Sequence, residues 1–178
     1  MVQTDKINLT RLVGMIKLFQ YLFFGWSLLI AKTTFAQGST QAQRNADNGL
    51  LEQYFVKNQV HPSKTQSGLY YVIKQQGSGE NAKPGKEVTV NYTGRLLNGK
   101  TFDSNTDPKF HHVQPFHFVL GMAEVIAGWD IGVQLLNVGS TATFYIPSAL
   151  GYGPEGSGNV IPPNSILVFD VELTDIED

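Results

Sequence analysis

The chain has 178 residues, of which 42% are apolar and 16% charged, a composition that supports one folded domain with an extra segment rather than a disordered chain. It contains no Cys, which excludes disulfide scaffolds, zinc–thiolate and iron–sulfur sites, and cysteine nucleophiles. The formal net charge is −2 and the Lys and Arg residues are scattered singly, so no nucleic acid is expected as a partner.

The first 36 residues have the order of a secretory signal. Three basic residues, ending at Lys17, precede an apolar run over residues 18–31, and Ala36 ends a Thr-Phe-Ala step suited to cleavage. The run is shorter than the about 20 apolar residues of a membrane-spanning helix. We therefore predict cleavage after Ala36, a periplasmic or otherwise exported protein, and no stable membrane span after cleavage. Retention of the segment as an anchor is the alternative.

Residues 37–66 are predicted to be an arm between this signal and a domain over residues 67–178. Residues 37–48 are polar, small and unperiodic, which is typical of a flexible spacer. A short helix is expected near residues 48–58, capped by Asp47 or Asn48.

This predicted helix carries one apolar stripe, formed by Leu50, Leu51, Tyr54 and Phe55. A short isolated helix is marginal in water, so the stripe must pack on something. Docking on the main domain is favoured, and a homodimer formed through the arm is the alternative.

The domain that follows shows the two-residue period of strands. Apolar and polar residues alternate over residues 88–96, 116–120, 141–146 and 167–173, which predicts sheets with one face exposed to solvent. Asn98-Gly99 between two of these runs indicates a hairpin.

One segment, residues 123–136, has helical spacing and is apolar nearly all round. Such a helix must be enclosed, so an α+β fold is expected, with an antiparallel sheet curled around a short helix.

Several motifs in this domain are decoys. The GYGPEG string at residues 151–156 matches a dinucleotide fingerprint, but the prolines within and after it forbid the helix that a pyrophosphate needs. His111, His112 and His117 are interpreted as solvated loop histidines, since no carboxylate lies at ligand spacing from them. No nucleophile lies beside a base in a recognisable motif, and we expect neither a metal site nor a cofactor.

A series of short motifs in fixed order covers about 110 residues of the domain. They are VNYTG at residues 90–94, GKTFDS at 99–104, PFHF at 115–118, EVIAGW at 124–129, GYG at 151–153, IPPN at 161–164 and LVFDVEL at 167–173. In this order the chain resembles the FKBP-type peptidyl-prolyl cis-trans isomerases, and its signal and arm resemble exported bacterial members with an N-terminal extension.

The resemblance implies an antiparallel half-barrel wrapped around a short helix, with a shallow apolar pocket between them and no cofactor. In it, Trp129 is the pocket floor, Tyr152 hydrogen-bonds a bound ligand, and Asp103 pairs with a pocket tyrosine. The Ile126 N–H would donate to a substrate carbonyl. The implied catalytic set is Tyr92, Asp103, Trp129, Tyr152 and Phe169, and the implied substrate-binding walls are Phe102, Phe116, Val125, Ile126 and Ile161.

The loop over residues 104–115 departs from the family pattern. It is a few residues longer than in minimal members and contains no Arg, which leaves Lys109 as the candidate basic partner of Asp103.

The implied activity is rotation about X–Pro bonds in proline-containing polypeptides and unfolded exported proteins, with macrolides as candidate inhibitors. The alternative is a periplasmic chaperone or Pro-segment binding module with incidental isomerase activity, for which the arm would be the grip.

Overall fold

The computed structural model describes residues 40–177, so the predicted signal over residues 1–36 lies outside the described part of the chain. The compact unit that holds the sheet begins at Gln43. Its residues 43–58 are helical and are called the N-terminal helix below. The strands are β1 Ser63–Lys64, β2 Tyr70–Gln75, β3 Glu87–Leu96, β4 Thr101–Ser104, β5 Phe116–Val119, β6 Thr141–Ile146 and β7 Leu167–Glu177. The other helices are α2 Ala127–Val133 and the 3₁₀ turns η1 Pro108–Phe110, η2 Ser148–Leu150 and η3 Gly153–Glu155.

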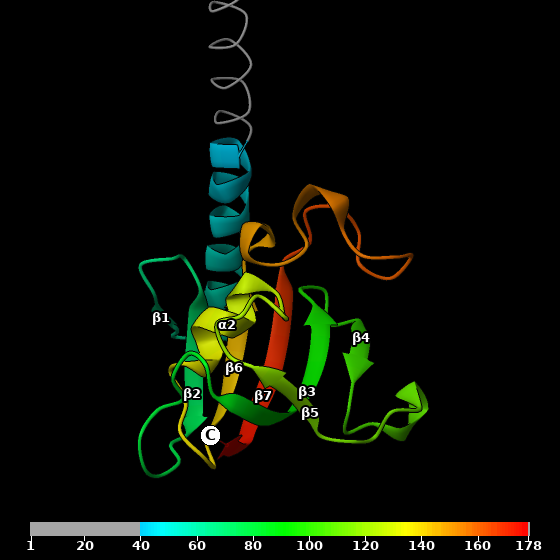
Figure 1. The fold of residues 1–178 in the computed structure, drawn as a ribbon. Coiled ribbons are helices and arrows are strands. Elements are labelled where there is room, and N and C mark those ends of the chain that lie inside the picture. Colours follow the sequence, from blue (N-terminus) through cyan, green and yellow to red (C-terminus); the bar gives the residue numbers. More distant parts are fainter. Residues whose placement is uncertain (1–39, 178) are drawn as a thin grey trace, which may run out of the picture. The chain divides into compact units, whose positions relative to one another are not determined.

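These strands form one antiparallel sheet in the order β1-β2-β6-β7-β3-β4, with β5 also paired to β3. Along one edge β3 pairs with β7, and along its other edge it pairs first with β5 and then with β4. Figure 1 shows α2 lying across one face of this curved sheet. The α+β prediction and the expected strands are confirmed, as is the hairpin between β3 and β4, where Gly99 has a φ of 88°.

The main core lies between α2 and the face of the sheet that carries Phe144, Ile146 and Phe169. The backbone of α2 approaches this face closely because two of its positions are glycine. A Cβ on Gly132 would lie 2.7 Å from the Phe144 ring, and a Cβ on Gly128 would lie 2.6 Å from Ile146. The close approach fixes α2 on the sheet and orients Trp129 between them.

The helix is shorter than the predicted range of 123–136. It spans Ala127–Val133, because the residues before it form a turn in which Ala123 has a φ of 56°. The carboxylate of Asp130 accepts from the N–H groups of Gly121 at 2.9 Å and Ala123 at 3.2 Å, which holds that turn in place. The shortening matters for the site, because it leaves residues 123–126 as a loop at the mouth of a cavity.

A second core lies on the opposite face of the sheet, where Leu51 and Phe55 of the N-terminal helix are buried. The ring of Phe55 lies 5.0 Å from that of Tyr145 and 5.2 Å from that of Tyr70. The expectation that this face would be exposed to solvent is therefore wrong for the part that the helix covers, and the favoured docking of the apolar stripe is what the structure shows. Leu50, which the sequence pattern places in that stripe, is instead 52% exposed.

The N-terminal helix also begins earlier than predicted. Residues 43–48, interpreted as spacer, are helical, and Asp47 is a buried residue within the helix rather than its cap. The reason is tertiary: the Asp47 carboxylate accepts hydrogen bonds from Ser148, far along the chain. Among the described residues, no helix is both long and apolar enough to cross a membrane.

Candidate active site

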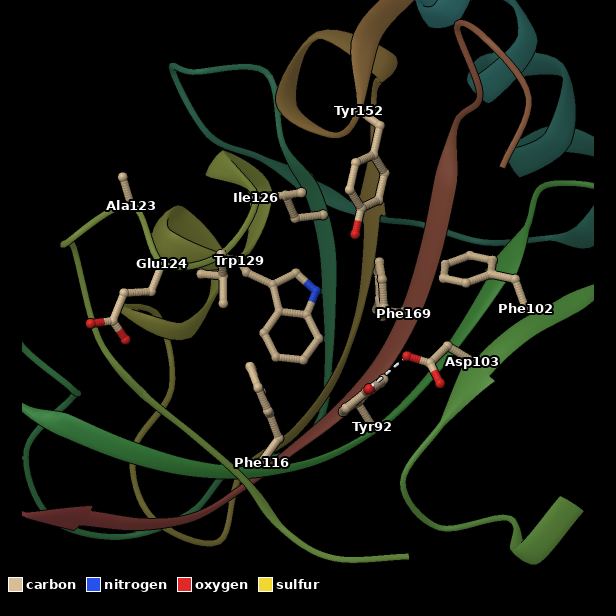
Figure 2. Close-up of a pocket in the computed structure, with 11 residues that line it drawn as sticks. Tyr92, Phe102, Asp103, Phe116, Ala123, Glu124, Ile126, Trp129, Tyr152 and Phe169 are labelled. Carbon is tan, nitrogen blue, oxygen red and sulfur yellow. Dashed lines mark hydrogen bonds between the residues drawn. The ribbon is translucent and has the colours of Figure 1, made fainter. Parts of the chain in front are cut away.

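A cavity of about 390 Å³ opens between α2, the strands β3 and β4, and the segment that carries Tyr152. Figure 2 shows its side chains arranged around the indole of Trp129. It is lined by Tyr92, Phe102, Asp103, Phe116, Ala123, Glu124, Val125, Ile126, Trp129, Tyr152 and Phe169.

Trp129 forms the floor of this cavity and is only 4% exposed. Its ring lies 5.2 Å from both Tyr92 and Phe169, at interplanar angles of 82° and 88°. Edge-to-face pairs of this kind are favoured by the ring quadrupoles, so the floor is held rigidly. Among the described residues, its Nε1 is the one buried side-chain nitrogen or oxygen without a hydrogen-bond partner, and Figure 2 shows it turned toward Phe169.

A glycine on β3 lets two of the walls meet. A Cβ on Gly94 would lie 2.6 Å from the Phe169 ring and 2.7 Å from the Phe102 ring, so only glycine admits both rings in these positions. The two rings meet edge to face at 5.5 Å. The result is a continuous aromatic wall beside the indole floor.

At the polar side of the cavity, the lining residues Tyr92 and Asp103 form a hydrogen-bonded chain with His112, which lies outside the lining. The Tyr92 hydroxyl donates to Oδ2 of Asp103 at 2.7 Å, and Nε2 of His112 lies 2.7 Å from the other oxygen. The N–H of Ser104 also donates to Asp103, at 2.9 Å. Burial, the hydrogen bond from Tyr92 to Asp103 and the negative charge of Asp103 raise the pKa of Tyr92 well above its usual 10.0, so Tyr92 remains a neutral donor.

Two hydrogen-bond donors at the cavity, besides Nε1 of Trp129, lack a partner in the described part of the chain. One is the hydroxyl of Tyr152, which Figure 2 shows pointing into the cavity. Burial and then the charge of Asp103 raise the pKa of Tyr152, which keeps its proton available for donation. The other is the N–H of Ile126, the residue that caps α2. Both can donate to acceptor atoms of a molecule bound in the cavity.

The structure brings together every predicted site residue except Ile161. Ile161 is 6% exposed and packs in the main core, where its N–H and C=O both bond to the backbone of Ser157, so it does not line the cavity. Two lining residues, Ala123 and Glu124, are absent from the predicted set, although Val125 and Ile126 of the same turn belong to it.

The basic partner of Asp103 also differs from the expectation. Lys109 pairs with Asp107 at 2.6 Å, and His112, interpreted as a solvated loop histidine, is the residue that reaches Asp103. His117 is likewise engaged, with Nδ1 2.9 Å from the hydroxyl of Thr89. The sequence offers one signal for His112, its place in the loop that follows Asp103, but nothing in that loop distinguishes it from His111.

The cavity lining favours non-covalent over covalent chemistry. Its lining contains no Ser, Thr, Cys, Lys or His, and both oxygens of Asp103 are engaged. Glu124 accepts from the N–H of Val119 at 2.9 Å. What remains is an aromatic enclosure with neutral hydrogen-bond donors, which is suited to hold an apolar ring and to donate to acceptor atoms beside it.

Comparison with known proteins agrees with this class. The family model of the FKBP-type peptidyl-prolyl cis-trans isomerases matches residues 78–174, more than half of the chain. The chain belongs to this family, which confirms the family resemblance of the domain that carries the motifs.

Individual relatives show the same likeness. A probable FKBP-type peptidyl-prolyl cis-trans isomerase of Haemophilus influenzae is 47% identical over 112 residues, 63% of this chain and 44% of that protein. The FKBP-type peptidyl-prolyl cis-trans isomerase FkpA of Aeromonas hydrophila is 41% identical over 150 residues, 83% of this chain and 53% of that protein. The chain thus spans about half the length of these curated relatives.

A solved structure of a peptidyl-prolyl cis-trans isomerase from Pseudomonas syringae pv. tomato has the same fold. It aligns with a TM-score of 0.64 and 31% identity, covering 78% of this chain and 96% of that one.

Proposed function

We propose that this protein catalyses cis–trans rotation about X–Pro bonds of polypeptides in the cavity above Trp129. The observation that carries the proposal is the combination of a rigid aromatic enclosure with two unpaired neutral donors, Tyr152 and the Ile126 N–H. An apolar ring of proline size fits such an enclosure, and the donors suit the carbonyls on either side of it.

The nature of the energy barrier to X–Pro rotation explains why the reaction needs no nucleophile. Rotation breaks amide resonance, with a barrier of about 18 to 20 kcal/mol, and takes tens to hundreds of seconds without a catalyst. Exclusion of water disfavours the planar, charge-separated amide relative to the twisted one. Each ~1.4 kcal/mol gained in the twisted state gives a tenfold rate increase.

Each part of the cavity has a place in this scheme. The indole of Trp129 supports the ring, with Phe169 and Phe102 beside it. Asp103 holds the hydroxyl of Tyr92 and so fixes that aromatic wall. Tyr152 and Ile126 bind carbonyls, which positions the peptide while the X–Pro bond turns.

A matched pair of tyrosine substitutions tests the proposal. Tyr152→Phe removes a hydroxyl in the cavity, whereas Tyr145→Phe removes one on the opposite face of the sheet. One uncharged hydrogen bond contributes about 0.5–1.5 kcal/mol, so Tyr152→Phe should lower kcat/KM for an X–Pro peptide by about two- to tenfold. Tyr145→Phe should leave it unchanged. A folded native protein that does not accelerate isomerisation would rule the proposal out.

The proposal also covers where the protein acts and what binds in its cavity. Residues 1–36 support export with cleavage after Ala36, so the clients would be proline-containing and unfolded exported proteins. Macrolides would compete for the same aromatic cavity. N-terminal sequencing of protein recovered from the exported fraction should begin at Gln37, and recovery of intact Met1 would instead indicate a retained anchor.

A further inference from the structure

Asp47 is a buried acidic residue on the N-terminal helix. The apolar residues of this helix do not need its carboxyl group in order to pack on the sheet. Asp47 is 1% exposed, and its hydrogen bonds come from neutral donors. Oδ2 accepts from the backbone N–H of Ser148 at 2.8 Å and from its hydroxyl at 2.6 Å, and Oδ1 accepts from Gln43 at 2.8 Å. Buried acidic groups are unfavourable unless their partners are fixed, so this contact is specific.

Ser148 begins the turn that leads to the cavity. It opens η2, with Pro147 between it and the end of β6, and its carbonyl accepts the N–H of Gly151 at 3.0 Å. Tyr152 is the next residue, and its side chain lines the cavity. Asp47 is therefore connected to Tyr152 through its hydrogen bonds with Ser148, the backbone hydrogen bond between Ser148 and Gly151, and the peptide bond from Gly151 to Tyr152.

The helix that carries Asp47 is fixed at the same end of the sheet. Phe55 packs edge to face on Tyr145, three residues before Ser148 on the chain, and Leu51 is fully buried one turn from Asp47. Figure 1 shows the N-terminal helix beside the turn that follows β6. The anchor for the turn is thus a rigid element rather than another loop.

The other restraints on this turn in the described residues are packing, as for Leu150 against the main core, and its own backbone hydrogen bonds. Gly151 lies against Leu167, since a Cβ on Gly151 would lie 3.1 Å from the leucine side chain. Within the turn, the N–H of Leu150 donates to the carbonyl of Pro147. The side-chain anchor that reaches Ser148 from another element is Asp47.

We propose that Asp47 is a positioning residue for the isomerase site: by holding Ser148, it sets the turn that directs the Tyr152 hydroxyl into the cavity. The N-terminal helix is then part of the active-site support. This inference rests on the proposed function for its kinetic readout, and the effect of Asp47 is expected only through Tyr152.

A double-mutant cycle in the full chain separates this role from a merely structural one. Asp47→Ala should lower kcat/KM for an X–Pro peptide by about two- to tenfold, mainly through KM, and by no more than Tyr152→Phe does. In the Tyr152→Phe background, Asp47→Ala should have no further effect, because the hydroxyl that it positions is already gone. Asp47→Asn, which keeps an oxygen for Ser148, should restore most of the native value.

A control variant removes comparable packing elsewhere. Leu173→Ala, at a fully buried position that does not line the cavity, should lower stability without changing kcat/KM in folded protein. If Asp47→Ala does not fold, Ser148→Ala removes the shorter of the two contacts and should give the same dependence on Tyr152.

The position of Tyr152 can also be measured without turnover. NMR of labelled tyrosine, assigned with Tyr152→Phe, should show the Tyr152 ring signals shifted in Asp47→Ala and native-like in Leu173→Ala. The inference would be overturned if the losses in kcat/KM from Asp47→Ala and Tyr152→Phe multiplied in the double variant. It would also be overturned if the Tyr152 ring signals did not move in Asp47→Ala. An inactive native protein with shifted ring signals would overturn the proposed function and leave the positioning role standing.

Discussion

Replacement of Leu51 by Ala measures whether the N-terminal helix is part of the folded domain. Leu51 is fully buried in the second core, whereas its neighbour Leu50 is 52% exposed. Truncating a fully buried Leu costs about 2–5 kcal/mol, while a surface substitution changes stability by about 0.5 kcal/mol or less. Leu50→Ala is therefore a control that differs in burial but not in helix propensity or chemistry.

The expected loss is large for a domain of this size. With total stability of about 5–15 kcal/mol and a urea slope of about 2 kcal/mol/M, a loss of about 3 kcal/mol lowers the unfolding midpoint by roughly 1.5 M. Urea titration of both variants, followed by far-UV circular dichroism, gives the comparison directly. Equal midpoints for Leu51→Ala and Leu50→Ala would show that the helix does not pack as described.

Three further substitutions test other parts of the structure. Burial alone would raise the pKa of Asp170, but hydrogen bonds from Lys74, Thr143 and Arg95 outweigh it and lower the pKa from 3.8 to about 2. The stabilisation from this carboxylate is thus present above about pH 4 and is lost as the pH falls toward 2. Once solvent screening is allowed for, Asp170→Asn should reduce the loss of unfolding free energy over this pH range by about 1–2 kcal/mol, measured by urea titration. An unchanged pH profile would contradict this. Gly132→Ala places a Cβ 2.7 Å from Phe144 and should cost about 1–3 kcal/mol in the same titration, so a neutral result would show that α2 can move away from the sheet. His112→Ala removes a partner of Asp103 and should lower kcat/KM about two- to threefold, with partial recovery in His112→Gln and no change in Lys109→Ala.

The strands and most of the site could be predicted from sequence because their signals are local. Alternation marks residues such as Phe144 and Phe169, whose side chains share the face toward α2. The site residues fall within short motifs whose order is typical of one family, so most of them can be named without any geometry. Ile161 is the exception, because a motif gives a residue's neighbourhood but not which way its side chain points.

The features that sequence could not give depend on contacts between distant or unpatterned segments. Residues 43–48 look like spacer because they are polar, and their helix is stabilised by Asp47, whose partner Ser148 lies 101 positions away. His112 reaches Asp103 from an aperiodic loop, where neither spacing nor composition selects one of two adjacent histidines.

The docked helix changes how the isomerase and chaperone hypotheses can be separated. Deletion of the arm would remove client holding but spare isomerisation only if the arm were independent of the domain. Here the deletion would strip Leu51 and Phe55 from the second core and Asp47 from Ser148, so both activities would fall for structural reasons. The exposed side of the same helix offers a cleaner comparison, because Leu50 and Val56 are 52% and 81% exposed and can be made polar without opening either core. Loss of client holding from that side alone would assign the grip to the helix surface and leave turnover to the cavity.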